Sequence, residues 1–174
     1  MLTLASVPND WTQCYQLIER LEIEELLCAA YVAAEMTLPV WLAATALSSE
    51  QLPINQAVSY LGAWLQNEND GSQARVLGDE VYRVVRASSV PTGTAERAAA
   101  FSAAHAVFAL SFHLGMCRQS GPEKVRAAVR DAVSQASSAA NWPEGGFSRA
   151  WGEQWLELTR VSFDHRRSRK QSES

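Results

Sequence analysis

A chain of 174 residues with 47% hydrophobic and 20% charged residues is long enough to bury a core and too apolar to be disordered. Its net charge of −4 is too small to indicate a nucleic-acid-binding surface over the whole molecule. The three cysteines are odd in number and widely spaced within helical patterns. They indicate buried thiols of a cytoplasmic protein and argue against a disulfide framework.

The first half of the chain is predicted to form helices that are separated at prolines. Asn9 or Asp10 can cap the first helix, and Pro39, which cannot donate a backbone hydrogen bond, is expected to break or kink it. Pro53, together with the serines at 48 and 49, is expected to form the next break. The predicted helices of this half span about residues 11–36, 40–47 and 54–65.

The apolar stretch 26–47 is long enough to be considered as a membrane span. Glu35 and Pro39 lie near its middle, and an ionised side chain at that depth is costly in a bilayer. Two core helices that meet at Pro39 explain the stretch better, so we expect no membrane association.

Four more helices are predicted in the second half of the chain. Thr94 is a suitable N-cap for one of them, and Pro122 suits the first turn of the next. Apolar residues at helical spacing, among them Val76, Leu158 and Val161, are assigned to the buried faces. These helices span about residues 73–87, 95–118, 122–140 and 149–165.

The helix predicted over 95–118 is apolar nearly all the way round. Phe108 and Phe112 fall on one side and Leu110 and Leu114 on the other, so both faces need a cover. We therefore expect an all-α bundle of about seven helices around this central alanine-rich helix. Without an internal repeat or a long linker, residues 1–165 are predicted to form a single domain, followed by a polar, basic tail over 166–174.

Charge is unevenly placed along the chain. Up to Tyr60 one basic residue, Arg20, stands against seven acidic ones, whereas four basic residues lie between 166 and 170. The sequence therefore predicts one acidic and one basic pole, which bears on the choice of partner more than on the fold.

Three side chains of the central region could form a ligand site. His113 and Cys117 are four residues apart, a spacing with which two side chains can hold one metal ion. A closed site needs four ligands, and no CxxC or HExxH pattern supplies the others, so no metal or other cofactor is assigned. His105 lies among phenylalanines, where it can be a hydrogen-bonded core residue or part of a ligand site.

Trp142 is the tryptophan least suited to full burial, because it lies in the proline- and glycine-rich loop 141–146. An exposed tryptophan is a good anchor for a protein partner. The alternative is that the ring folds back over the bundle.

Three segments resemble the alanine-rich helical immunity proteins of bacterial polymorphic toxin systems: CAAYVAAEMTLP, LPINQAVSYLGAWL and AERAAAFSAAHAVFAL. The Ala63-Trp64 pair and the Ala104-His105 pair carry the likeness, which covers about residues 26–115. The chain departs from the pattern after Gly121, where a second histidine-containing alanine motif is missing.

The resemblance implies a protein that binds and neutralises a cognate toxin and is not an enzyme. In that reading Glu19, Glu22, Glu24 and Glu25 would face a basic toxin surface, since complementary charge speeds association.

Other interpretations stay open beside it. The chain could be a small-molecule- or metal-binding bundle that uses His105, His113 and Cys117, or an enzyme whose site is assembled from scattered residues. A DNA-binding regulator is disfavoured because no basic recognition helix stands out, and a homodimer remains possible.

Overall fold

The computed structural model describes residues 7–45 and 48–172, and over these ranges it contains seven α-helices and no strand. This confirms the predicted all-α single-domain bundle. The ends of the predicted domain and tail, residues 1–6 and 173–174, lie outside the described ranges. The helices are α1 (Trp11–Arg20), α2 (Ile23–Ala44), α3 (Ser48–Leu65), α4 (Ala74–Ala87), α5 (Ala95–His113), α6 (Pro122–Ala140) and α7 (Arg149–Ser172).

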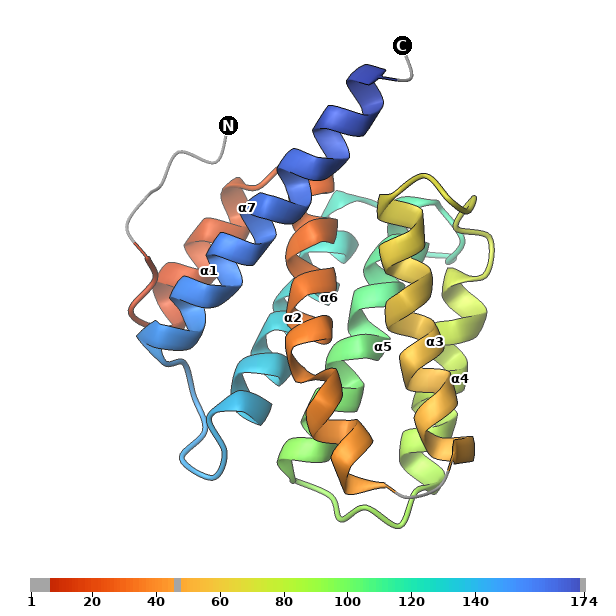
Figure 1. The fold of residues 1–174 in the computed structure, drawn as a ribbon, viewed down its shortest axis with the longest axis vertical. Coiled ribbons are helices and arrows are strands. Elements are labelled where there is room, and N and C mark those ends of the chain that lie inside the picture. Colours follow the sequence, from red (N-terminus) through yellow and green to blue (C-terminus); the bar gives the residue numbers. More distant parts are fainter. Residues whose placement is uncertain (1–6, 46–47, 173–174) are drawn as a thin grey trace.

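The alanine-rich helix α5 is the centre of the bundle, as predicted. It packs against α2, α3, α4 and α6 (Figure 1). Thr94 caps it by accepting a hydrogen bond from the Arg97 backbone N–H at 3.5 Å. The helix ends at His113 and not near 118, because the chain turns through Gly115 with a positive φ of 72°.

The first predicted helix is in fact two helices. α1 begins after Asp10, whose side chain caps it as expected, but ends at Arg20. Glu22 and Glu25 then form a capping box in which the Glu22 backbone N–H donates to Glu25 Oε2 at 3.0 Å. A new helix therefore begins at Ile23, in a different direction from the first.

Both prolines that were expected to separate helices lie inside them. α2 continues through Pro39, and α3 begins at Ser48, before Pro53. The connection between the two helices is held by side chains. Trp41 is buried and donates its indole N–H to the Glu50 carbonyl at 3.1 Å, and Gln51 donates to the carbonyls of Leu42 and Thr45. These contacts stabilise the turns that each proline weakens, so neither proline separates two helices; of the break or kink expected at Pro39, the break is wrong.

α2 is the one helix of the described residues that is long and apolar enough to cross a membrane. Of its most apolar stretch, 56% is buried within the bundle. The core helix of a folded domain gives the same result, so the absence of membrane association stays a prediction.

The last helix extends well beyond His165. α7 reaches Ser172, and its C-terminal end projects past the other helices (Figure 1). Arg166 is only 5% exposed and donates from Nη1 to the carbonyls of Trp64 and Leu65 at 3.1 and 2.7 Å, which caps the end of α3. The prediction that the chain frays after His165 is wrong for residues 166–172.

The acidic and basic poles that the sequence predicts come together in the fold. Glu24, near the start of α2, lies against Lys170 and is 3.8 Å from the Arg166 guanidinium, both on α7. At this point of the fold, acidic and basic side chains from distant parts of the chain therefore compensate each other's charge.

Candidate functional site

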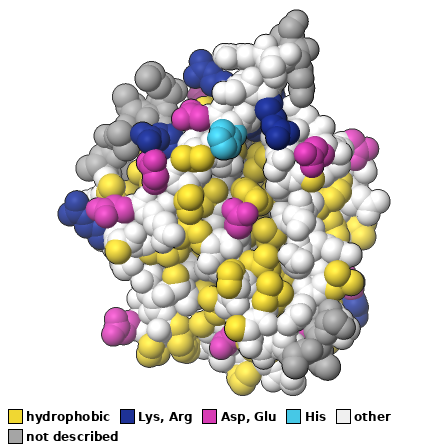
Figure 2. All heavy atoms as spheres, in the orientation of Figure 1, with side chains coloured by type: hydrophobic (Ala, Val, Ile, Leu, Met, Phe, Trp, Pro, Cys, Tyr) yellow, Lys and Arg dark blue, Asp and Glu magenta, His cyan; other side chains and the backbone are white. Residues whose placement is uncertain are grey.

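A groove runs along α2 where α3 and α7 flank it. It encloses about 530 Å³. Tyr31, Val32 and Glu35 of α2 form its floor, and side chains of α3 and α7 form its walls. Figure 2 shows hydrophobic side chains gathered over the middle of this face, with an acidic side chain among them.

The apolar walls of the groove come from side chains that the sequence assigned to the core. Leu158 and Val161 are 40% and 41% exposed. α7 crosses α2 at an angle (Figure 1) and buries Trp155, which donates its indole N–H to the Ala29 carbonyl at 3.0 Å. The neighbouring stripe of α7 is thereby turned toward the groove, which explains why these two residues are not buried.

Glu35 places a carboxylate on this apolar floor. Tyr31 donates its hydroxyl hydrogen to Glu35 Oε1 at 2.7 Å, and burial, reinforced by this carboxylate, raises the pKa of the tyrosine. The Tyr31 ring can lie against α3 because residue 62 is glycine, where a Cβ would stand 3.0 Å from the ring. Over the described residues, no cation pairs with Glu35, so its charge faces the open groove.

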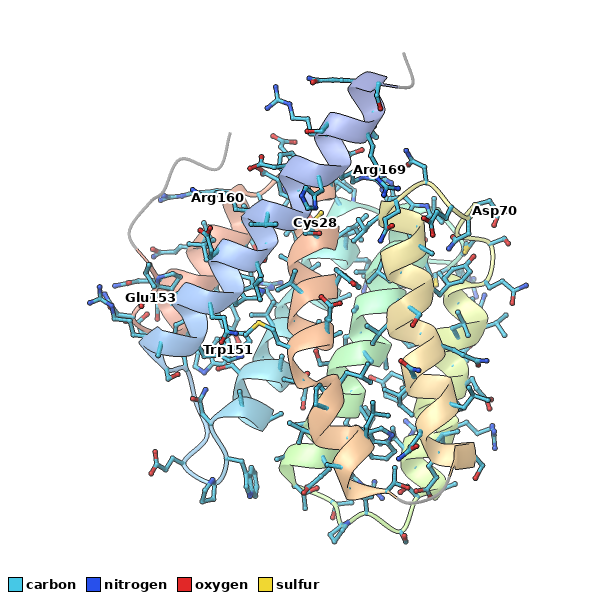
Figure 3. All side chains as sticks on the ribbon, in the orientation of Figure 1. Cys28, Asp70, Trp151, Glu153, Arg160 and Arg169 are labelled. Atoms are coloured by element: carbon cyan, nitrogen blue, oxygen red, sulfur yellow. The ribbon has the colours of Figure 1, made fainter. Side chains whose placement is uncertain are left out.

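The far end of the groove is basic. His165 and Arg169 line it, and Arg169 reaches from α7 toward the C-terminal end of α3 (Figure 3), where its Nη1 lies 3.4 Å from the Gln66 carbonyl. The groove thus offers an apolar floor that carries one carboxylate, and a basic end where Arg169 also lies 3.9 Å from Glu68.

The glutamates that the sequence proposed as partner contacts are largely occupied within the fold. Glu19 lies 3.8 and 3.4 Å from the guanidinium groups of Arg126 and Arg130 on α6. Glu25 is buried in the capping box and cannot meet a partner, and Glu24 contacts α7 as described above. Glu22 is exposed at the start of α2.

Trp142 is 51% exposed in the loop between α6 and α7. The ring does not fold back over the bundle, and it remains accessible to a partner.

A second candidate site is a hollow of about 320 Å³ over α4, α5 and α6. Tyr82, His105 and Asp131, one from each helix, lie together in it, and Lys124 of α6 also lines it. Tyr82 Oη lies 3.1 Å from His105 Nε2, and His105 Nδ1 lies 3.8 Å from Asp131 Oδ2. Burial lowers the pKa of His105, although the Asp131 carboxylate opposes this shift, and burial raises the pKa of Tyr82.

The other two ligand candidates are not brought together. α5 ends at His113, so Cys117 lies in the following turn and the four-residue spacing does not place both on one helical face. His113 is exposed and its ring lies at 74° to that of Trp64, with 5.8 Å between the centroids, whereas Cys117 Sγ lies 3.5 Å from Ser111 Oγ. Within residues 7–45 and 48–172, no group of three or more His, Cys, Asp or Glu side chains could hold a metal ion.

No protein-family model, curated protein or solved structure matches this chain.

Sequence reasoning missed most of the residues that build these two sites. Tyr82 and Asp131 lie far from His105 along the chain and only the packing of three helices unites them. The one available signal for the groove was Glu35, a charge in an otherwise apolar stretch.

Proposed function

We propose that the protein acts without catalysis, by binding another protein, and that it is an immunity-type inhibitor of a toxin. The observation that carries the proposal is the groove along α2, in which Leu158 and Val161 leave apolar surface uncovered beside the carboxylate of Glu35. Exposed apolar side chains that gather in a groove, with polar groups at its rim, are typical of a protein-binding surface.

The chemistry of the groove suits an amphipathic segment of a partner that carries a basic side chain. Its apolar residues would cover Leu158 and Val161, and its cation would pair with Glu35, which has no such partner within the described residues. A charge pair at the centre of an apolar contact fixes the register of the two partners more than it adds affinity. Trp142, exposed on a separate loop, would be a second anchor for the partner.

The test begins with the tagged protein in the cells that naturally make it, and with identification of the proteins that copurify in stoichiometric amounts. The binding of each purified candidate is then measured with the wild type and with Leu158→Glu/Val161→Glu. The matched control is Val76→Glu, because Val76 is another exposed apolar residue, on α4 and outside the groove lining.

We expect the double variant to bind at least about tenfold more weakly, since it places charges in an apolar contact, and the control to bind as the wild type does. Glu35→Gln should weaken binding less, and mainly at low salt. Coexpression should also protect cells from growth arrest by the partner. A partner that binds the double variant as tightly as the wild type, or that harms no cell, would contradict the proposal.

A further inference from the structure

The hollow over α4, α5 and α6 contains a hydrogen-bonding gap between His105 and Asp131. Their Nδ1 and Oδ2 atoms are 3.8 Å apart, which exceeds the length of a hydrogen bond. A group that fills such a gap must contact both atoms. The properties of the gap follow from which ring nitrogen of His105 carries the hydrogen.

The hydrogen is assigned to Nδ1 by the neighbours of the ring. The Tyr82 hydroxyl lies 3.1 Å from Nε2 and can donate to a bare Nε2 or accept from an Nε2–H. A neutral imidazole that accepts at Nε2 carries its hydrogen on Nδ1. The opposite tautomer would turn a bare lone pair toward the Asp131 carboxylate, which is unfavourable. The gap therefore lies between a donor, Nδ1–H, and an acceptor, Oδ2.

Only a group that both accepts and donates can bridge these two atoms. A hydroxyl does so: its oxygen accepts from Nδ1–H and its hydrogen is donated to Asp131. A methyl group can neither accept nor donate, and an ionised carboxylate can accept from the histidine but has no hydrogen to donate to Asp131.

The walls beside the gap are aromatic and apolar. Phe108, Phe112, Ala127 and Ala128 line the hollow. The Tyr82 and Phe108 ring centroids lie 5.7 Å apart, and those of Phe108 and Phe112 lie 6.3 Å apart. A further ring can pack against such faces. A volume of about 320 Å³ is near the lower limit of ligand pockets, so the ligand is small.

We propose that this hollow is a binding site for a small aromatic alcohol of the phenol class, whose hydroxyl bridges His105 Nδ1 and Asp131 Oδ2 while its ring packs against Phe108 and Phe112. Lys124 lines the same hollow and suits a polar substituent on the outer side of the ring. The site shares no lining residue with the groove along α2, so it is independent of the proposed protein-binding function.

The experiment is a titration of the full chain with phenol, in which two-dimensional ¹H–¹⁵N NMR spectra are recorded at each phenol concentration. Toluene is the matched probe, because it replaces the hydroxyl by a methyl group of similar size. Asp131→Ala removes the acceptor, and Asp131 is 62% exposed, so this variant is expected to fold. Asp79→Ala is the control, since it removes an exposed carboxylate of α4 that does not line this hollow.

We expect phenol to shift the resonances of Tyr82, His105 and Phe112 and to bind about tenfold or more tightly than toluene, as a hydrogen bond to a charged group implies. Asp131→Ala should reduce this preference several-fold, because only the bond from His105 remains, whereas Asp79→Ala should retain it in full. Equal binding of the two probes, an unchanged preference in Asp131→Ala, or shifts confined to other parts of the chain would each overturn the proposal. The ring nitrogen chemical shifts of His105 in the free protein give a second test. A hydrogen on Nε2 and not on Nδ1 would also overturn the proposal.

Discussion

The guanidinium of Arg166 lies over the indole of Trp64, with 4.3 Å between its carbon and the ring centroid. The same side chain donates to the Trp64 carbonyl, so one residue of α7 holds both the ring and the backbone at the end of α3. This contact joins the two walls of the groove at its basic end. It also holds this part of α7 against the bundle, whereas Arg167 beside it is exposed.

Replacing Arg166 by alanine should destabilise the fold by about 2–4 kcal/mol. The substitution removes hydrogen bonds from a charged donor and a cation–π contact, and it leaves carbonyls at the end of α3 without their partner. Urea unfolding followed by circular dichroism measures the change. Arg167→Ala is the control, because Arg167 is exposed, and it should unfold as the wild type does. Equal stability of the two variants would show that the Arg166 contacts at the end of α3 do not contribute to the free energy of unfolding.

Helical periodicity identified the helices better than it identified their ends. The two-faced apolar pattern of α5 and the cap at Thr94 follow from local sequence, which is why the central helix was predicted correctly. Pro39 and Pro53 were misjudged, because the contacts that hold the chain helical through them come from Trp41 and Gln51 across the α2–α3 connection. The helix-breaking tendency of proline is a local property, so it does not predict contacts with residues of the next helix.

The candidate sites depend on packing even more strongly. Leu158 is exposed because of the angle at which α7 crosses α2. The spacing of apolar residues along a helix does not predict the angle at which that helix crosses its neighbour. Of the hollow, the sequence singled out His105 alone. Tyr82 and Asp131 are ordinary polar residues on the surfaces of α4 and α6 until the bundle assembles.

Gly71 should tolerate alanine less well than Gly93 does. Both have a positive φ, 77° and 70°, so an alanine costs about 1–2 kcal/mol of backbone strain at either position. At Gly71 the added Cβ would also stand 3.1 Å from Trp64 Cδ1 and still closer to Leu114, whereas nothing lies within 4 Å at Gly93. We therefore expect Gly71→Ala to lose about 1–3 kcal/mol more than Gly93→Ala in thermal or urea unfolding. Equal losses would mean that the neighbouring side chains move aside freely.

The three cysteines should differ sharply in reactivity. Burial raises the pKa of Cys14 to about 12 and that of Cys28 to about 11, so both remain thiols at pH 8, and both side chains are inaccessible. Cys117 is partly exposed in the turn after α5. A chromogenic disulfide reagent should titrate one thiol per native chain at pH 8 and three in urea. Cys117→Ser should abolish the native reaction; rapid modification of Cys14 or Cys28 would mean that the bundle opens readily.

The stability of the bundle should fall as the pH is lowered from 7 toward 5. Burial holds the pKa of His105 below its ordinary value of 6.5, so the unfolded chain takes up a proton before the folded chain does. The free energy of unfolding that depends on neutral His105 is fully present above pH 6.5. It is lost as the pH falls from that value through the lowered pKa of the folded state. Urea midpoints at a series of pH values measure this loss.

His105→Gln isolates the histidine's part, because glutamine can still accept a hydrogen bond from Tyr82 but does not titrate. This variant should lose less stability than the wild type between pH 7 and pH 5. His113→Gln is the matched comparison: partial burial also lowers the pKa of His113, but this side chain is more exposed than that of His105, so we expect its removal to change the profile less. An unchanged pH profile in His105→Gln would mean that His105 is protonated as readily in the fold as in the unfolded chain, with Asp131 compensating fully for its burial.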